Sequence, residues 1–153
     1  MISDETYNNR LTDAKVALSD WAEKNAAGAH ITIDQGDLYW RICAEPLERS
    51  ICPIELIFRD DRNYDIAVAD ASLEDQPIVD FEVFPPIFEA VSGGNVVTRS
   101  YFSRTTQQLL ATRTIVPLAD YDDWEVWNKT ALGERIGIAD SLIEDRKYAR
   151  YAR

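Results

Sequence analysis

The sequence has few of the residues that bind metal ions or carry covalent chemistry. Cys43 and Cys52 are its two cysteines, and His30 is its one histidine. Structural zinc sites usually take four cysteine or histidine ligands, so this supply predicts no metal site. The cysteines stand nine residues apart and form no Cys-x-x-Cys pair, which fits a protein of a reducing compartment.

Long apolar runs are also missing. No stretch approaches the roughly 20 apolar residues that a membrane-spanning helix needs. Residues 1–5 are polar and acidic, whereas a secretory signal begins with basic residues that an apolar stretch follows. We therefore predict a cytoplasmic protein that does not bind a membrane.

The local signatures of common active sites are absent as well. The chain has no Walker loop, no Gly-x-Gly-x-x-Gly, no Gly-x-Ser-x-Gly and no His-Glu-x-x-His. Gly93 and Gly94 are followed by an asparagine and two valines, without the lysine of a phosphate-binding loop. We predict no catalytic residue and no cofactor. An enzyme stays open as an alternative, because many active sites have no local signature.

One charge sign dominates the composition. The chain has 27 Asp and Glu residues against 16 Lys and Arg, a net charge of −11. This excess opposes binding to nucleic acid phosphates and favours association with a basic protein. Hydrophobic residues make up 46% of the chain, which is typical of a folded domain rather than a disordered segment.

Hydrophobic spacing in the first half predicts a helix and two hairpins. Residues 3–26 place Tyr7, Leu11, Ala14, Leu18 and Trp21 on one helical face. Residues 31–43 alternate with period two around a turn at 34–37, which would pair Ile33 with Leu38. A second hairpin is expected over residues 54–69, with its turn at residues 60–63.

The second half has a less regular pattern. We expect a loop over residues 71–80, a short helix that ends at Gly93, and a third hairpin over residues 95–118. Residues 120–153 look mainly helical, with Asp122 and Glu125 as an N-cap and its N3 partner. The fold class is therefore α+β: a mostly antiparallel sheet of about six strands packed by helices, in the order α-ββββ-α-ββ-α. We expect one domain over residues 1–153, with a short basic segment at 146–153.

This order of elements is similar to that of the type III secretion chaperones, which are small, acidic, dimeric α/β proteins. They follow the order α-βββ-α-ββ-α, so this chain would carry an extra strand. Gly93 and Gly94, which precede the third hairpin, are compatible with the resemblance. The resemblance implies a dimer that escorts another protein.

Candidate binding residues stand out by the local loss of negative charge. No acidic residue occurs between Glu89 and Asp120, and this stretch carries Arg99, Arg104 and Arg113. The hairpin is a candidate surface for an anionic or polar partner. Alternatively, strands disfavour Asp and Glu in any case, and the arginines pair with acidic residues of the same chain.

Aromatic residues supply the other candidates. Tyr148 and Tyr151 belong to the basic segment 146–153, which either docks on its own acidic body or contacts a partner. Trp124 and Trp127 stand three residues apart, would share one face of a helix, and either join the core or anchor an interface.

Two groups of residues resemble chemical sites but have plainer interpretations. His30 and Cys43 are diagonal neighbours on one face of the first hairpin, as a Cys-His pair requires. No Asn or Asp is placed to orient the imidazole, which favours a half-buried thiol beside an edge histidine. The acidic residues 120–125 fail as an EF-hand loop, because Glu125 stands where glycine is required.

The sequence thus favours a non-catalytic acidic interaction module that acts as a homodimer and binds another protein. It would escort that partner or, as an immunity or inhibitor protein, neutralise it. One alternative is a ligand-binding protein or enzyme with a site between sheet and helices, using His30, Cys43, Arg99 or Arg113. Another is a structural subunit of a larger assembly.

Overall fold

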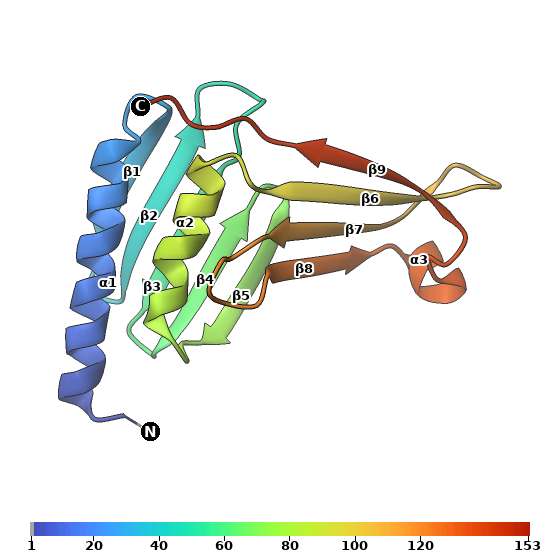
Figure 1. The fold of residues 1–153 in the computed structure, drawn as a ribbon. Helices are drawn as coiled ribbons and strands as arrows, with labels where there is room; N and C mark the ends of the chain where they lie inside the picture. Colours follow the sequence, from blue (N-terminus) through green and yellow to red (C-terminus); the bar gives the residue numbers. More distant parts are fainter. Residues whose placement is uncertain (1) are drawn as a thin grey trace.

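The protein folds into two antiparallel sheets and three helices, and the computed structural model describes residues 2–153 (Figure 1). The first sheet is a meander of β1 (Ala29–Gln35), β2 (Tyr39–Pro46), β3 (Ile54–Arg59), β4 (Asn63–Val68) and β5 (Ala71–Pro77). Helices α1 (Asp4–Lys24) and α2 (Phe84–Ser92) cover one face of it, and the short 3-10 helix η1 (Phe81–Val83) precedes α2. No helix within residues 2–153 is long and apolar enough to cross a membrane. We call residues 2–92 the body.

Helix α1 confirms the prediction from the sequence. Ser3 caps it by accepting a hydrogen bond from the backbone N–H of Thr6, and Asp4 and Glu5 suit the positive end of the helix dipole. The helix ends at Lys24, where the Asn25 N–H bonds back to two carbonyls of the last turn. The predicted apolar face packs in the core with buried residues of the sheet and of α2.

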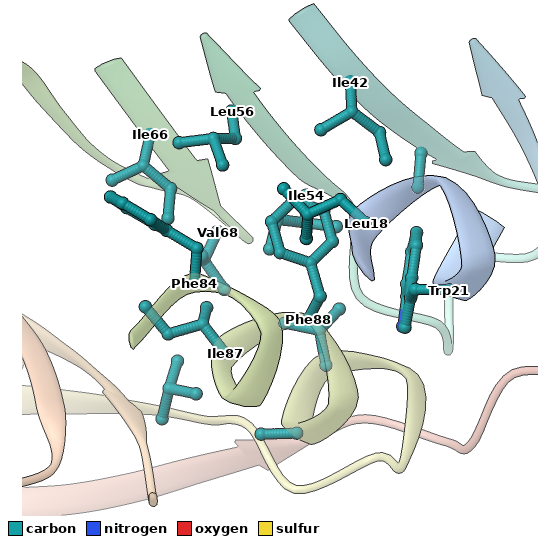
Figure 2. Close-up of a cluster of buried hydrophobic side chains, with 14 of the residues drawn as sticks. Leu18, Trp21, Ile42, Ile54, Leu56, Ile66, Val68, Phe84, Ile87 and Phe88 are labelled. Carbon is teal, nitrogen blue, oxygen red and sulfur yellow. The ribbon is translucent and has the colours of Figure 1, made fainter. Parts of the chain in front are cut away.

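The core lies between the two helices and the inner face of the first sheet (Figure 2). Ile42, Leu56 and Ile66 are direct neighbours across β2, β3 and β4, so their side chains form one row on that face. Phe88 of α2 is fully buried, with its ring edge-on to Trp21 at 4.9 Å between centroids. The opposite face of the sheet carries mostly polar side chains, as a half-solvated antiparallel sheet should.

The second sheet forms an arm that leaves the body (Figure 1). Its strands are β6 (Val97–Ser103), β7 (Leu109–Val116), β8 (Trp124–Lys129) and β9 (Ser141–Lys147), in the order β8-β7-β6-β9. Helix α3 (Ala131–Ile136) joins β8 to β9 at the far end. We call residues 97–147 the arm. Its near end joins the body core through Val116 and Trp124.

Helix α3 is docked on β7 by a close backbone approach. Thr130 caps the helix, and its hydroxyl also donates to a carbonyl of β7. A Cβ atom on Gly133 would lie 1.9 Å from the Leu110 carbonyl oxygen, so only glycine fits there. The docked helix buries a small separate cluster of Tyr101, Leu110 and Ala111.

The C-terminal segment folds back onto the body. Ala149 bridges to Ile51, and the Tyr151 hydroxyl donates to the Cys52 carbonyl. The backbone of residues 148–152 passes so close to Gly28 and Gly94 that a Cβ on either would lie within 3 Å of it. The basic segment therefore docks on its own chain, which is one of the two alternatives that the sequence left open.

The expected fold class is correct, but the structure has nine strands instead of about six. Residues 71–77, expected as a loop, form edge strand β5, in which Ala71 and Leu73 point inward between polar residues. Residues 120–153, expected as mainly helical, contain β8, the short α3 and β9. Both errors concern polar edge strands, whose pairing comes from tertiary contacts that local composition does not reveal.

Two local details also differ from the predictions. Ile33 pairs with Ile42 rather than with Leu38, because the turn lies two residues later than expected, after Gln35, which pairs with Trp40. Asp122 and Glu125 do not cap a helix, since Glu125 lies inside β8. In a strand, three-residue spacing places Trp124 and Trp127 on opposite faces, so they do not share one.

Candidate functional site

Arg99, Arg113 and Trp127, three of the predicted binding residues, come together on one face of the arm. Arg99 lies directly opposite Arg113, Arg113 opposite Trp127, and Arg99 opposite Asp145 on its other side. Directly opposed residues point to the same face of a sheet, so Trp127, Arg113, Arg99 and Asp145 form one row across all four strands. We call these four residues the arginine row.

Each arginine of the third hairpin is paired within the chain. Arg99 donates two hydrogen bonds to the Asp145 carboxylate, at 2.8 and 3.0 Å, and Arg113 donates to Glu125. These donors hold the pKa values of Asp145 and Glu125 below the usual range for carboxyl groups. Arg104 pairs with Asp140 across the far end of the arm, at 2.9 Å. The positive charge that the sequence suggested for an anionic partner is therefore largely neutralised.

Trp127 is the exposed aromatic residue of this face. Its ring stacks on Tyr101 at 5.4 Å between centroids, and the Arg113 guanidinium lies 5.1 Å from its centroid. The side chain is nevertheless 42% exposed. Trp124 packs against the body core instead, which is the other of the two alternatives that the sequence left open for the tryptophans. Tyr101 and Arg113 thus fix the position of the Trp127 ring, while the exposed part of the ring remains available to a partner.

The opposite face of the arm carries an uncovered apolar group at its far end. Phe102 is the direct neighbour of Leu109 on one side and of Leu142 on the other. Leu109 is 38% and Leu142 42% exposed, and Phe102 is half-buried. Helix α3 does not cover these residues, because it packs on the face that carries Tyr101. We call Phe102, Leu109 and Leu142 the tip patch.

Sequence reasoning missed the tip patch, although a signal for it existed. Leu142 and Ile143 are adjacent apolar residues in a segment that is otherwise polar. In a strand, adjacent residues point to opposite faces of the sheet. Two adjacent apolar residues therefore place one apolar side chain on each face, and both faces need a covering element to bury them. The helical expectation for residues 120–153 hid this signal, because adjacent residues in a helix can lie near the same face.

Tyr148 and Tyr151 lie inside the molecule. The Tyr148 hydroxyl shares a hydrogen bond with Thr98, at 3.1 Å, and the Tyr151 ring lies 5.8 Å from that of Trp21. Burial raises the pKa of both hydroxyls. Neither ring is accessible for stacking on a partner while the C-terminal segment is docked.

His30 and Cys43 remain diagonal neighbours, since His30 pairs with Glu45 and Thr32 with Cys43. Burial raises the pKa of the Cys43 thiol, which is the reverse of thiolate activation. The Cys52 thiol is more deeply buried, and its pKa is raised to about 12. The part of the chain that the structure describes contains no group of three or more potential ligand side chains arranged for a metal ion.

A hollow of about 310 Å³ lies where the arm meets the body. Arg146 lines it, with its guanidinium 4.8 Å from the Tyr148 ring and bonded to the Arg49 carbonyl at 2.8 Å. The lining includes none of the residues that the ligand-binding alternative would use, which are His30, Cys43, Arg99 and Arg113. The hollow and these side chains do not form one site.

The chain matches no family model, and comparisons with the curated proteins and with the solved structures likewise found no match. The resemblance to type III secretion chaperones therefore rests on element order alone. The observed order departs from theirs, with five strands before α2 and a strand on each side of α3.

Proposed function

We propose that this protein is a non-catalytic interaction module that acts as a homodimer and binds another protein through the far half of its arm. The observation that carries the proposal is the tip patch, an apolar group that residues 2–153 leave uncovered. Contiguous exposed apolar groups within a polar surround are typical of contact surfaces.

The composition of the far half of the arm supports this choice. Trp127 on one face and the tip patch on the other offer large apolar side chains, which supply most of the energy at protein interfaces. The neutralised arginine row and the hydroxyl side chains Ser100 and Thr112 offer polar contacts around them. An apolar centre with a polar rim is the usual anatomy of a protein interface.

Charge suggests what kind of partner is attracted. Residues 1–95 contain 19 acidic and 7 basic residues, a net charge of −12. A field of this sign accelerates the approach of a basic protein, while the apolar contacts of the arm hold it. An escort that shields a basic protein and an inhibitor that neutralises one both require this combination.

A second candidate function uses the same surface. A structural subunit of a larger assembly would bury its tip patch against other copies of the same protein instead of a different protein. The identity of whatever contacts Leu142 distinguishes the two functions.

Site-specific photo-crosslinking in the source cells tests the proposal. A photoreactive amino acid at Leu142 is compared with the same amino acid at Val79, a body residue that is 87% exposed. We expect Leu142 to give one dominant protein adduct that Val79 does not give. An adduct with this chain itself would favour the assembly subunit. Equal, diffuse labelling from both positions would overturn the arm as a binding surface.

A further inference from the structure

Strand β1 is an open edge of the body sheet. It pairs with β2 on one side, and the strand order β1-β2-β3-β4-β5 leaves its other side without a neighbour among residues 2–153. An open edge presents free backbone N–H and C=O groups, and folded proteins usually protect such edges with charges, bulges or prolines. The seven residues of β1 contain no proline, and their pairing with β2 is continuous.

The sequence of β1 is complementary to itself. If two copies run antiparallel with Thr32 opposite Thr32, then Ile31 faces Ile33, and His30 faces Asp34. Every residue from Ala29 to Gln35 finds a partner in this register, because Thr32 is the middle residue of the strand. Thr–Thr and β-branched pairs are among the cross-strand pairs that stabilise antiparallel sheets, and an imidazole nitrogen can hydrogen-bond to a carboxylate opposite it.

This register also keeps the faces of the two sheets aligned. A two-fold axis through Thr32, perpendicular to the sheet, pairs residues of the same face with each other. Ile33 pairs with the buried Ile42 inside the chain, so it points to the helix side, yet it is 40% exposed. A second copy would place its own Ile31 beside this side chain.

A groove beside β1 has room for such a neighbour. Its volume is about 490 Å³, and it lies between the second half of α1 and the strand. Ala22 of α1 and Ala26 of the turn that follows the helix line one side, and Ile31 and Ile33 line the strand side. Two grooves would meet at the two-fold axis.

The edge strand β9 lacks these properties. Its last four residues are Glu144, Asp145, Arg146 and Lys147. In a two-fold antiparallel pair, the residue on the axis lies opposite the same residue of the second copy. If any of these four residues lay on the axis, two like charges would therefore face each other. Charged edges of this kind discourage strand addition.

We propose that two copies of the chain pair through β1, antiparallel about Thr32, to form one continuous ten-stranded sheet. The two α1 helices then lie on the same face. Because β5 contacts β8 at the other side of each body, the two arms extend from opposite ends of the sheet. The pairing gives the homodimer of the proposed function its interface, and it does not depend on what the arm binds.

Disulfide trapping at the axis tests the register. Directly opposed residues have Cα atoms about 4.5–5.5 Å apart, within the range that a disulfide bridges. Thr32 also lies opposite Cys43 within the chain, so the test variant is Thr32→Cys combined with Cys43→Ser. We expect mild oxidation to convert it into a covalent dimer that reductant reverses.

The matched control is His30→Cys in the same Cys43→Ser background. In the proposed register, the two copies of residue 30 are four residues out of line, on the order of 13 Å apart, so they should not cross-link. Equal cross-linking of both variants would indicate random collision and overturn the register. Cross-linking of the residue 30 variant alone would also overturn the register. If neither variant forms cross-links, the proposed β1 interface is wrong.

Sedimentation of the native chain gives an independent readout. We expect a dimer whose dissociation constant rises on the order of tenfold in His30→Asp, because the substitution sets a second carboxylate opposite Asp34 at two places in the interface. Asn128→Asp, which adds a negative charge to the exposed edge strand β8, should leave the constant unchanged. A native chain that stays monomeric at its highest soluble concentration would overturn the inference. In that case, a partner adduct at Leu142 would still support the arm as the surface that binds the partner protein.

Discussion

The body and the arm are both antiparallel sheets, but they bury their side chains differently. In the body, two helices cover most of one face, and the other face is mostly polar. In the arm, α3 covers part of one face, and exposed apolar groups remain on both. The difference shows that the same kind of sheet serves as a core in one half and as a surface in the other.

Charge follows the same division. The body, residues 2–92, has 19 acidic and 7 basic residues, a net charge of −12, whereas the arm, residues 97–147, has 8 acidic and 7 basic residues, a net charge of −1. Most arginines of the arm are paired with carboxylates of the arm itself. The body therefore provides a long-range field, and the nearly neutral arm provides short-range contacts.

The largest expected effect comes from the body core. Phe88→Ala should lower the free energy of unfolding by about 3–5 kcal/mol, because it empties a fully buried site between α2 and the sheet. Leu142→Ala at the tip should change it by less than about 0.5 kcal/mol. Chemical denaturation measures both values. Similar losses would mean that the tip patch is part of a core and would contradict the comparison.

Gly133→Ala tests how α3 is held on the arm. The new Cβ would collide with the Leu110 carbonyl, so the helix must move, at a cost of about 1–3 kcal/mol. We expect faster amide hydrogen exchange around Leu110, with exchange in β2 and β3 unchanged. Accelerated exchange throughout the body would show that arm and body are one cooperative unit.

The sequence predicted α1 and hairpin β1–β2 better than the edge strands, for a physical reason. Helix α1 and hairpin β1–β2 each bury one face, so their apolar residues repeat with a clear period. Strands β5 and β9 lie at edges and are mostly exposed, so their composition resembles that of a loop or a polar helix. The arginines were identifiable by the gap in negative charge, but the ion pairs depend on strand register that the sequence left unspecified.

Tyr151→Phe tests the docking of the C-terminal segment with a smaller change. Loss of the hydroxyl's hydrogen bond to the Cys52 carbonyl should lower stability by about 1 kcal/mol. Burial raises the pKa of this hydroxyl, so the group favours the folded state below pH 10 and loses that contribution as pH rises further. The variant should therefore lose less stability than the native chain above pH 10. An equal loss would indicate that the Tyr151 hydroxyl does not contribute.

The smallest expected effect belongs to the arginine row. Asp145→Asn should lower stability at pH 7 by at most about 1 kcal/mol, because the pair with Arg99 is partly exposed. The pKa of Asp145 is lowered, so its contribution is present at neutral pH and is lost as pH falls through that pKa. Native and variant stabilities should converge in acid. Asp122→Asn, which changes an exposed carboxylate outside the row, should leave the stability at pH 7 within about 0.5 kcal/mol of the native value.

Quantitative affinity purification from the source cells tests most directly whether the arm holds the partner. The tagged native chain is compared with Leu142→Glu at the tip patch and with Val79→Glu on the body, at low and at high salt, after circular dichroism shows that all three are folded. We predict one protein recovered in stoichiometric amount with the native chain and with Val79→Glu, reduced on the order of tenfold with Leu142→Glu, and weakened by salt. Undiminished recovery with Leu142→Glu would contradict the account, because partner binding would then not depend on the tip patch.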